Sequence, residues 1–132
     1  MNNKKSGNDF EQEFCNLLAS RGFWAHNMAN RKNGQPADVI AVKDGKAYLI
    51  DCKVCSGNKF DFKRVEENQV YAMERWSACR NGSGWFALKF GDSIYMMAYD
   101  HINELETQGR KSITLKDIDL TVYTFEEWLG AI

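Results

Sequence analysis

Apolar residues near the start of the chain recur with the spacing of an amphipathic helix. Phe10, Phe14 and Leu18 follow one another at four-residue intervals, between an Asp9 that can cap a helix start and a Gly22 that can end one. We therefore expect a first helix from Asp9 to Gly22. The same helical period predicts two further helices, over residues 65–80 and 101–108.

Runs of β-branched and aromatic residues alternate with these helices and predict strands. The strongest signal is the dipeptide Asp44-Gly45, typical of a two-residue hairpin turn, which separates strand-forming segments at 37–42 and 46–54. Polar residues predict loops at 29–36 and 56–64. Further strands are expected over residues 23–28, 84–90 and 93–99. This order of elements is typical of an α/β fold, with helices flanking a mixed β-sheet.

Length and composition fit one domain. The chain has 132 residues, 44% of them hydrophobic, so we expect a single domain over residues 1–132 with a loose polar leader at 1–8. No signal peptide or membrane-spanning run is evident, which fits a reduced, cytoplasmic protein. Cys52 and Cys55 have the spacing of half a metal-thiolate site, but the remaining cysteines and histidines are scattered, which argues against such a site. The lack of a Gly-rich phosphate loop argues against a nucleotide cofactor.

The hairpin register brings two aspartates together. A turn at Asp44-Gly45 pairs Lys43 with Lys46, and the pairing continues until Asp38 faces Asp51. Directly opposed residues have Cβ atoms roughly 4.5–5.5 Å apart, where like charges are destabilising unless something compensates. A divalent cation would compensate them.

Strand alternation also predicts a lysine beside these two aspartates. Lys53 lies on the same face as Asp51, whereas Ile50 and Cys52 point to the other face. Two carboxylates beside a lysine suit Mg²⁺-assisted phosphodiester hydrolysis, because the metal activates water while the lysine stabilises developing charge. The alternative is a pair of exposed strand carboxylates with an ordinary surface lysine. Asp is disfavoured in strands, which counts against that alternative.

Two more polar residues lie at the edges of apolar helical faces. Glu11 shares a stripe with Cys15 and Leu18, so it is better placed than Glu13 to reach inward. It could equally be a first-turn acid stabilised by the helix dipole. Gln69 opens the apolar face of the second helix and could be a capping or packing residue.

Basic residues gather beside the hairpin and late in the chain. The formal net charge of −1 gives no overall basic excess, so any DNA binding must come from such local clusters. These side chains could hold phosphates without reading bases, although solubility explains any single one equally well. The candidate DNA-binding residues are Arg31, Lys32, Lys59, Lys63, Arg64, Arg110 and Lys111.

Three segments together resemble the PD-(D/E)xK nuclease superfamily: GNDFEQEF at 7–14, PADVIAV at 36–42 and YLIDCK at 48–53. The first, with the RGFWA that follows, is similar to Hjc-type Holliday junction resolvases. DFKRVEENQ at 61–69 and GRKSITLKDI at 109–118 are more similar to RecU-type resolvases. Only 27 positions separate Glu11 from Asp38, which leaves no room for the RecU stalk insertion.

The resemblance covers nearly the whole chain and implies a restriction-endonuclease-like fold. It also implies a metal site and a catalytic lysine. The implied acidic residues are Glu11, Asp38 and Asp51, with the Cys52 backbone carbonyl as a further metal ligand, Lys53 as the catalytic lysine and Gln69 as an auxiliary catalytic residue. In two respects the chain departs from the usual pattern, because Ala37 separates the Pro-Asp pair and the second acid is the shorter Asp.

The expected function is a Mg²⁺-dependent, structure-selective DNA endonuclease, with Mn²⁺ able to substitute, that resolves Holliday junctions in DNA recombination, repair or phage DNA processing. We expect a homodimer, because a four-way junction needs two coordinated cuts. Trp24, Trp85 and Tyr95 are candidate interface residues. Two alternatives remain at this point: a restriction, repair or flap nuclease of the same fold, and a non-catalytic DNA-binding relative.

Overall fold

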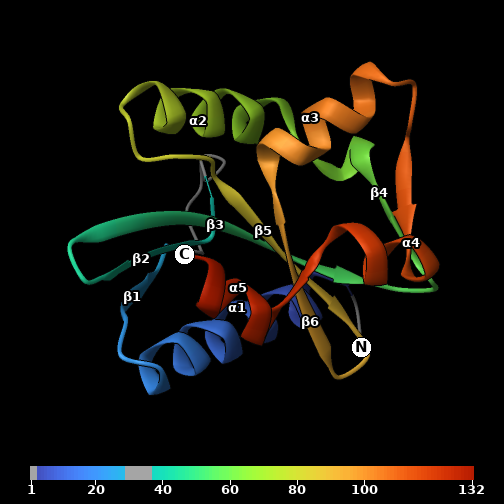
Figure 1. The fold of residues 1–132 in the computed structure, drawn as a ribbon. Helices are drawn as coiled ribbons and strands as arrows, with labels where there is room; N and C mark the ends of the chain where they lie inside the picture. The colour runs from blue at the N-terminus through green and yellow to red at the C-terminus, as the bar shows by residue number, and fades with distance from the viewer. Residues whose placement is uncertain (1–2, 29–36) are drawn as a thin grey trace.

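The computed structural model describes residues 3–28 and 37–132 and places a six-stranded sheet at the centre of the chain (Figure 1). Neighbouring strands are antiparallel except for β3 and β5, which run parallel, so the predicted mixed sheet is confirmed. In their order across the sheet the strands are β1 (Trp24–Asn27), β2 (Val39–Lys43), β3 (Lys46–Cys55), β5 (Trp85–Phe90), β6 (Ser93–Ala98) and β8 (Tyr123–Thr124).

Helices cover both faces of this sheet, as Figure 1 shows. Phe14 of α1 and Trp128 of α5 belong to one buried apolar cluster, whereas Met73 of α2 and Ile102 of α3 belong to a second cluster on the opposite face. No helix in the described part of the chain is long and apolar enough to cross a membrane. The helices are α1 (Asn3–Ser20), α2 (Glu67–Ala78), α3 (Tyr99–Thr107), α4 (Leu115–Thr121) and α5 (Phe125–Ala131).

The predicted hairpin is confirmed in turn and register. Asp44 and Gly45 both have positive φ, 53° and 77°, as a two-residue turn of this kind requires, and Lys43 pairs with Lys46. The ladder continues to Val39, opposite Ile50. Asp51 and Lys53 therefore emerge from β3 at alternate positions on the face toward α2, while Ile50 and Cys52 join the apolar cluster against α1.

Two regions differ from the expected elements. Helix α1 begins at Asn3, so residues 3–8, expected as a loose leader, are helical. The segment expected as a loop after the hairpin contains β4 (Lys59–Asp61) and the 3₁₀ helix η1 (Phe62–Arg64). Strand β4 pairs with β7 (Ser112–Thr114) in a second, two-stranded sheet, and such three-residue strands are too short to show a periodic pattern.

Candidate active site

The site lies next to the start of β2, where the β2–β3 ladder stops at the pair of Val39 and Ile50. Asp38, in a bend before Val39, donates its backbone N–H to the Ile50 carbonyl at 3.2 Å, and its carboxylate Oδ2 accepts the Cys52 N–H at 2.8 Å. The regular ladder stops one residue before the Asp38 and Asp51 pair that the register predicts. Asp38 turns onto the edge of β3 instead of facing Asp51 across the ladder.

Asp51 is the most deeply buried of the candidate carboxylates, with 1% of its surface exposed. Its Oδ1 accepts a hydrogen bond from Gln69 Nε2 at 3.0 Å, and its Oδ2 lies 3.0 Å from Lys53 Nζ in an ion pair. Burial raises the pKa of Asp51 well above its usual range, and the charge of Asp38 raises it further, while Lys53 acts in the opposite direction. Asp38 and Asp51 are therefore close enough for their charges to repel, although they are not paired across the ladder as the register predicts.

The Lys53 side chain extends from β3 toward polar groups of η1 and α2. Its side chain is 11% exposed, and Nζ donates to the Arg64 carbonyl at 3.0 Å and to Gln69 Oε1 at 3.2 Å. With Asp51 as its counter-ion, the ammonium is held from three directions. The position of Lys53 is thus defined by three separate elements, which is the condition for an accurately placed catalytic group.

Gln69 combines the two roles that the sequence left open. Its Oε1 accepts the backbone N–H of Glu66 at 3.0 Å, which completes a capping box at the start of α2. The same side chain contacts Asp51 and Lys53. Gln69 therefore ties the first turn of α2 to the charged groups of β3.

Glu11 approaches the same region from α1 on the opposite face of the sheet. It is 8% exposed, and its Oε2 is buried without a hydrogen-bond partner among the residues that the structure describes. Burial raises the pKa of Glu11 to about 7, helped by the charge of Asp38 and a hydrogen bond with the Asp38 carboxyl, and opposed by Lys53. Glu13 instead points outward and pairs with Lys89 at 2.6 Å. Glu11 is thus the inward-facing acid, as its position on the apolar stripe predicts.

The raised pKa of Glu11 predicts how the metal-free protein responds to pH. Because its pKa is about 7 in the folded protein and 4.5 in an ordinary glutamate side chain, the folded state binds more protons between these values, and stability falls as pH rises through them. We expect the free energy of unfolding of Glu11→Gln to fall by about 1–3 kcal/mol less than that of the unmodified protein over this pH range. Denaturant titrations in EDTA between pH 4.5 and 8 measure it. An unchanged pH slope in the variant would contradict the assignment.

The carboxylates supply hard oxygen donors without forming a closed metal cage. Within residues 3–28 and 37–132, no group of three or more His, Cys, Asp or Glu side chains is arranged as a metal site. Glu11 and Asp38 are instead hydrogen-bonded to each other, and in the same part of the chain Glu11 Oε2 is buried without a hydrogen-bond partner, while Asp51 Oδ2 is paired with Lys53. Cys15, Cys52 and Cys55 are buried free thiols and Cys79 is an exposed one. The available donors fit Mg²⁺ better than a thiolate-bound metal.

The small β4 and β7 sheet joins two of the basic clusters. The Lys111 carbonyl accepts the Phe62 N–H at 2.9 Å, which places the late basic pair beside η1. Lys63 is 87% exposed, whereas Arg110 pairs with Asp117 at 3.1 Å. Of the predicted DNA-binding residues, Arg31 and Lys32 lie outside the described residues, and exposed positions near η1 are occupied by Lys59, Lys63, Arg64 and Lys111.

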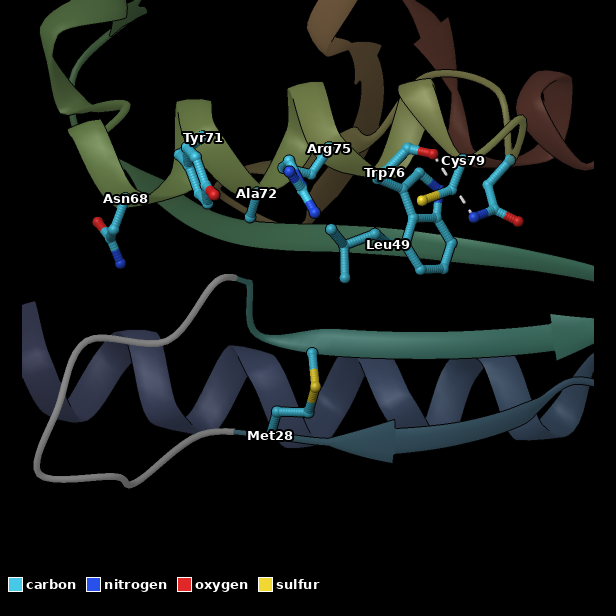
Figure 2. A pocket seen from close by; sticks show the side chains of 9 residues that line it. Met28, Leu49, Asn68, Tyr71, Ala72, Arg75, Trp76 and Cys79 are labelled. Carbon is cyan, nitrogen blue, oxygen red and sulfur yellow. Dashed lines mark hydrogen bonds between the residues drawn. The ribbon is translucent and has the colours of Figure 1, made fainter.

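A groove of about 690 Å³ runs along α2, separate from these charged groups. Figure 2 shows Tyr71, Arg75 and Trp76 of α2 facing Leu49 and Met28 across it. No local pattern in the sequence indicates this groove, because its lining residues come from three separate segments. Helix α2 therefore contributes one side chain, Gln69, to the carboxylate cluster, while its neighbours on the helix line a different surface.

Comparisons with known proteins identify the family. Residues 2–130 match the family model "Archaeal holliday junction resolvase (hjc)". The chain is 25% identical over 127 residues to the crossover junction endodeoxyribonuclease Hjc of Methanocaldococcus jannaschii, covering 96% of this chain and 88% of the relative.

A solved structure agrees with this match. The structure of Hjc from Archaeoglobus fulgidus, a Holliday junction resolvase from an archaeal hyperthermophile, aligns with a TM-score of 0.69 at 16% identity, covering 93% of this chain and 98% of that chain. The predicted restriction-endonuclease-like fold is confirmed by this likeness. The chain belongs to the archaeal Holliday junction resolvase (Hjc) family, which confirms the resemblance to PD-(D/E)xK nucleases of the resolvase type.

Proposed function

We propose that this protein is a Mg²⁺-dependent endonuclease that resolves four-way DNA junctions. The observation that carries the proposal is the buried group of Asp51, Lys53 and Gln69 beside Asp38, at the end of β3. A buried aspartate with a raised pKa is costly to maintain, and proteins keep such groups chiefly at functional sites. Family membership supports DNA as the substrate and a junction as its form.

The metal would be held by oxygen atoms from both faces of the sheet. The proposed ligands are the carboxylates of Glu11, Asp38 and Asp51 and the backbone carbonyl of Cys52. Mg²⁺, or Mn²⁺ in its place, would polarise the scissile phosphate and lower the pKa of a bound water. Loss of the proton that Glu11 holds at its raised pKa would free its carboxylate for metal binding, so metal affinity is expected to rise with pH.

Lys53 would act on the phosphate. Its ammonium sits beside Asp51, and one of its present contacts, to Gln69 or Arg64, can be exchanged for a phosphate oxygen. The positive charge would then stabilise the charge that develops in the transition state. Gln69 would keep the Asp51 carboxylate oriented throughout, through its 3.0 Å hydrogen bond.

We further propose a homodimer in which two sites act on one junction. Trp24 on the edge strand β1 is 62% exposed, the feature expected of an interface residue, while Trp85 packs against Trp128 and Tyr123 within the chain. The exposed lysines near η1 would hold phosphates beside each site. Sedimentation of the protein alone and with junction DNA measures the assembly.

The proposed substrate is tested with synthetic DNA. We expect purified protein to introduce paired symmetric nicks into a four-way junction when Mg²⁺ is added, and none in EDTA. Linear duplex and flap substrates of the same sequence are the controls. Equal cleavage of the flap would favour a repair-type nuclease, and junction binding without any cleavage would favour a non-catalytic relative.

A further inference from the structure

Past the Val39–Ile50 pair, where the β2–β3 ladder stops, no strand in the described part of the chain pairs with this edge of β3, and two side chains contact it instead. Asp38 accepts the Cys52 N–H at 2.8 Å. Two residues further along the same edge, Arg64 Nη1 donates to the Val54 carbonyl at 2.9 Å. Because alternate residues of a strand direct their backbone groups to the same side, both contacts lie on the side vacated by β2.

Arg64 also contacts Lys53 in the reverse direction. The backbone carbonyl of Arg64 accepts a hydrogen bond from Lys53 Nζ at 3.0 Å. The Arg64 guanidinium in turn donates to the carbonyl of Val54, the residue that follows Lys53. The two segments are therefore joined by a reciprocal pair of contacts, each made by the side chain of one segment to the backbone of the other. This arrangement fixes the distance between η1 and β3 at the position of Lys53.

The guanidinium of Arg64 makes two further contacts, although the residue as a whole is exposed. Its Cζ lies 6.0 Å from the centre of the Phe60 ring, and Nη1 approaches Cys55 Sγ at 3.9 Å. The planar guanidinium can stack on the ring and donate to a carbonyl simultaneously, which a lysine cannot do. Phe60 is itself fully buried, so the stacked group rests on a rigid surface.

We propose that Arg64 is a positioning residue for Lys53, rather than the DNA phosphate contact that the sequence predicts. The rest of η1 supports this role, because Asp61 Oδ1 accepts the Lys63 N–H at 3.1 Å and the Phe62 N–H donates to the Lys111 carbonyl. The turn is thus held at Lys111, next to β7, on one side and at β3 on the other. The proposal deepens the proposed function and rests on it, because it assigns a second residue to the catalytic lysine.

Loss of the guanidinium should release Lys53 in the absence of any DNA. In Arg64→Gln, we expect acetylation of Lys53 by an amine-reactive reagent, measured by mass spectrometry of the full chain after digestion, to rise several-fold. Lys89 is the internal control, because it is also ion-paired and partly buried but lies outside the contacts of Arg64. Unchanged labelling of Lys53 would overturn the proposal, whatever the nuclease activity.

Cleavage kinetics separate positioning from DNA binding. With enzyme in excess of a four-way junction, Arg64→Gln should lower the saturating cleavage rate by about tenfold or more, because small displacements of a catalytic group cost rate. Its Kd for the junction in EDTA, and the salt dependence of that Kd, should stay near those of the unmodified protein. Lys116→Gln, which removes an exposed charge on α4, is the charge-matched control.

The opposite pattern would identify a phosphate contact. Lys63→Gln supplies the reference for such a contact, since it should weaken binding and reduce the salt slope by about 1. Arg64→Gln behaving like Lys63→Gln, at an unchanged saturating rate, would overturn the proposal. Arg64→Lys keeps the charge but loses the stacked plane, and should give intermediate Lys53 labelling and an intermediate rate; full recovery of both would also overturn it. Circular dichroism melting verifies that each variant is folded. If Arg64→Gln is unfolded, the labelling of Lys53 and the cleavage rate are both measured on Arg64→Lys instead.

Discussion

Replacing Asp51 with Asn is expected to lower the rate of junction cleavage by at least about a thousandfold. The change keeps the size of the side chain and one acceptor for Gln69, but removes the negative charge that faces Lys53 at 3.0 Å. It also removes a proposed metal ligand. Single-turnover cleavage of a four-way junction in Mg²⁺ measures the loss, and junction binding in EDTA should be largely retained.

The matched control is Asp92→Asn, at the exposed turn between β5 and β6, which should cleave at the normal rate. Asp51→Asn should also remain folded, because it relieves the cost of burying a carboxylate whose pKa that burial raises. Cleavage by a folded Asp51→Asn protein at a rate close to normal would refute the assignment of the site.

Replacing Trp128 with Ala is expected to reduce the free energy of unfolding by about 3–5 kcal/mol, the range for large buried aromatics. Trp128 is fully buried, and its ring contacts four others, from Phe23, Tyr48, Trp85 and Phe125. Its removal would leave a cavity between α5 and the sheet. Guanidinium denaturation of the metal-free protein measures the change.

Trp128→Phe is the informative companion. It keeps an aromatic ring in the cluster and removes an indole N–H that is buried without a hydrogen-bond partner in the described part of the chain. Its loss of stability should be less than half that of Trp128→Ala, because less of the packing is lost and an unsatisfied donor disappears. Equal losses in the two variants would show that the stability depends on the indole itself.

The hairpin was predictable because local chemistry determines it. Asp44-Gly45 fixes the turn, the turn fixes the register, and the register places Asp51 and Lys53 on one face. The inward position of Glu11 followed from helical spacing in the same way. The sequence did not reveal that β2 begins only at Val39, because the bend at Asp38 depends on hydrogen bonds to β3 that are visible only in three dimensions.

Contacts between residues far apart in the sequence account for the other differences between the predicted and the observed structure. Strands β4 and β7 have three residues each and pair Lys59 with Thr114 across more than fifty positions, so no local pattern announces them. The role of Arg64 was hidden for the same reason. Its partners are the Lys53 ammonium, the Val54 carbonyl and the Phe60 ring. In the sequence, a basic residue in a polar stretch gives the same pattern whether it faces solvent or contacts a strand.

The edge of β3 that β2 does not cover also affects the tendency of the protein to aggregate. A strand edge with free N–H and C=O groups is a template on which another chain can add a strand, and this route leads to aggregation. Asp38 and Arg64 occupy that edge at Cys52 and Val54. These two side chains therefore also protect a central strand from edge-to-edge association, so a change at either one is expected to increase aggregation.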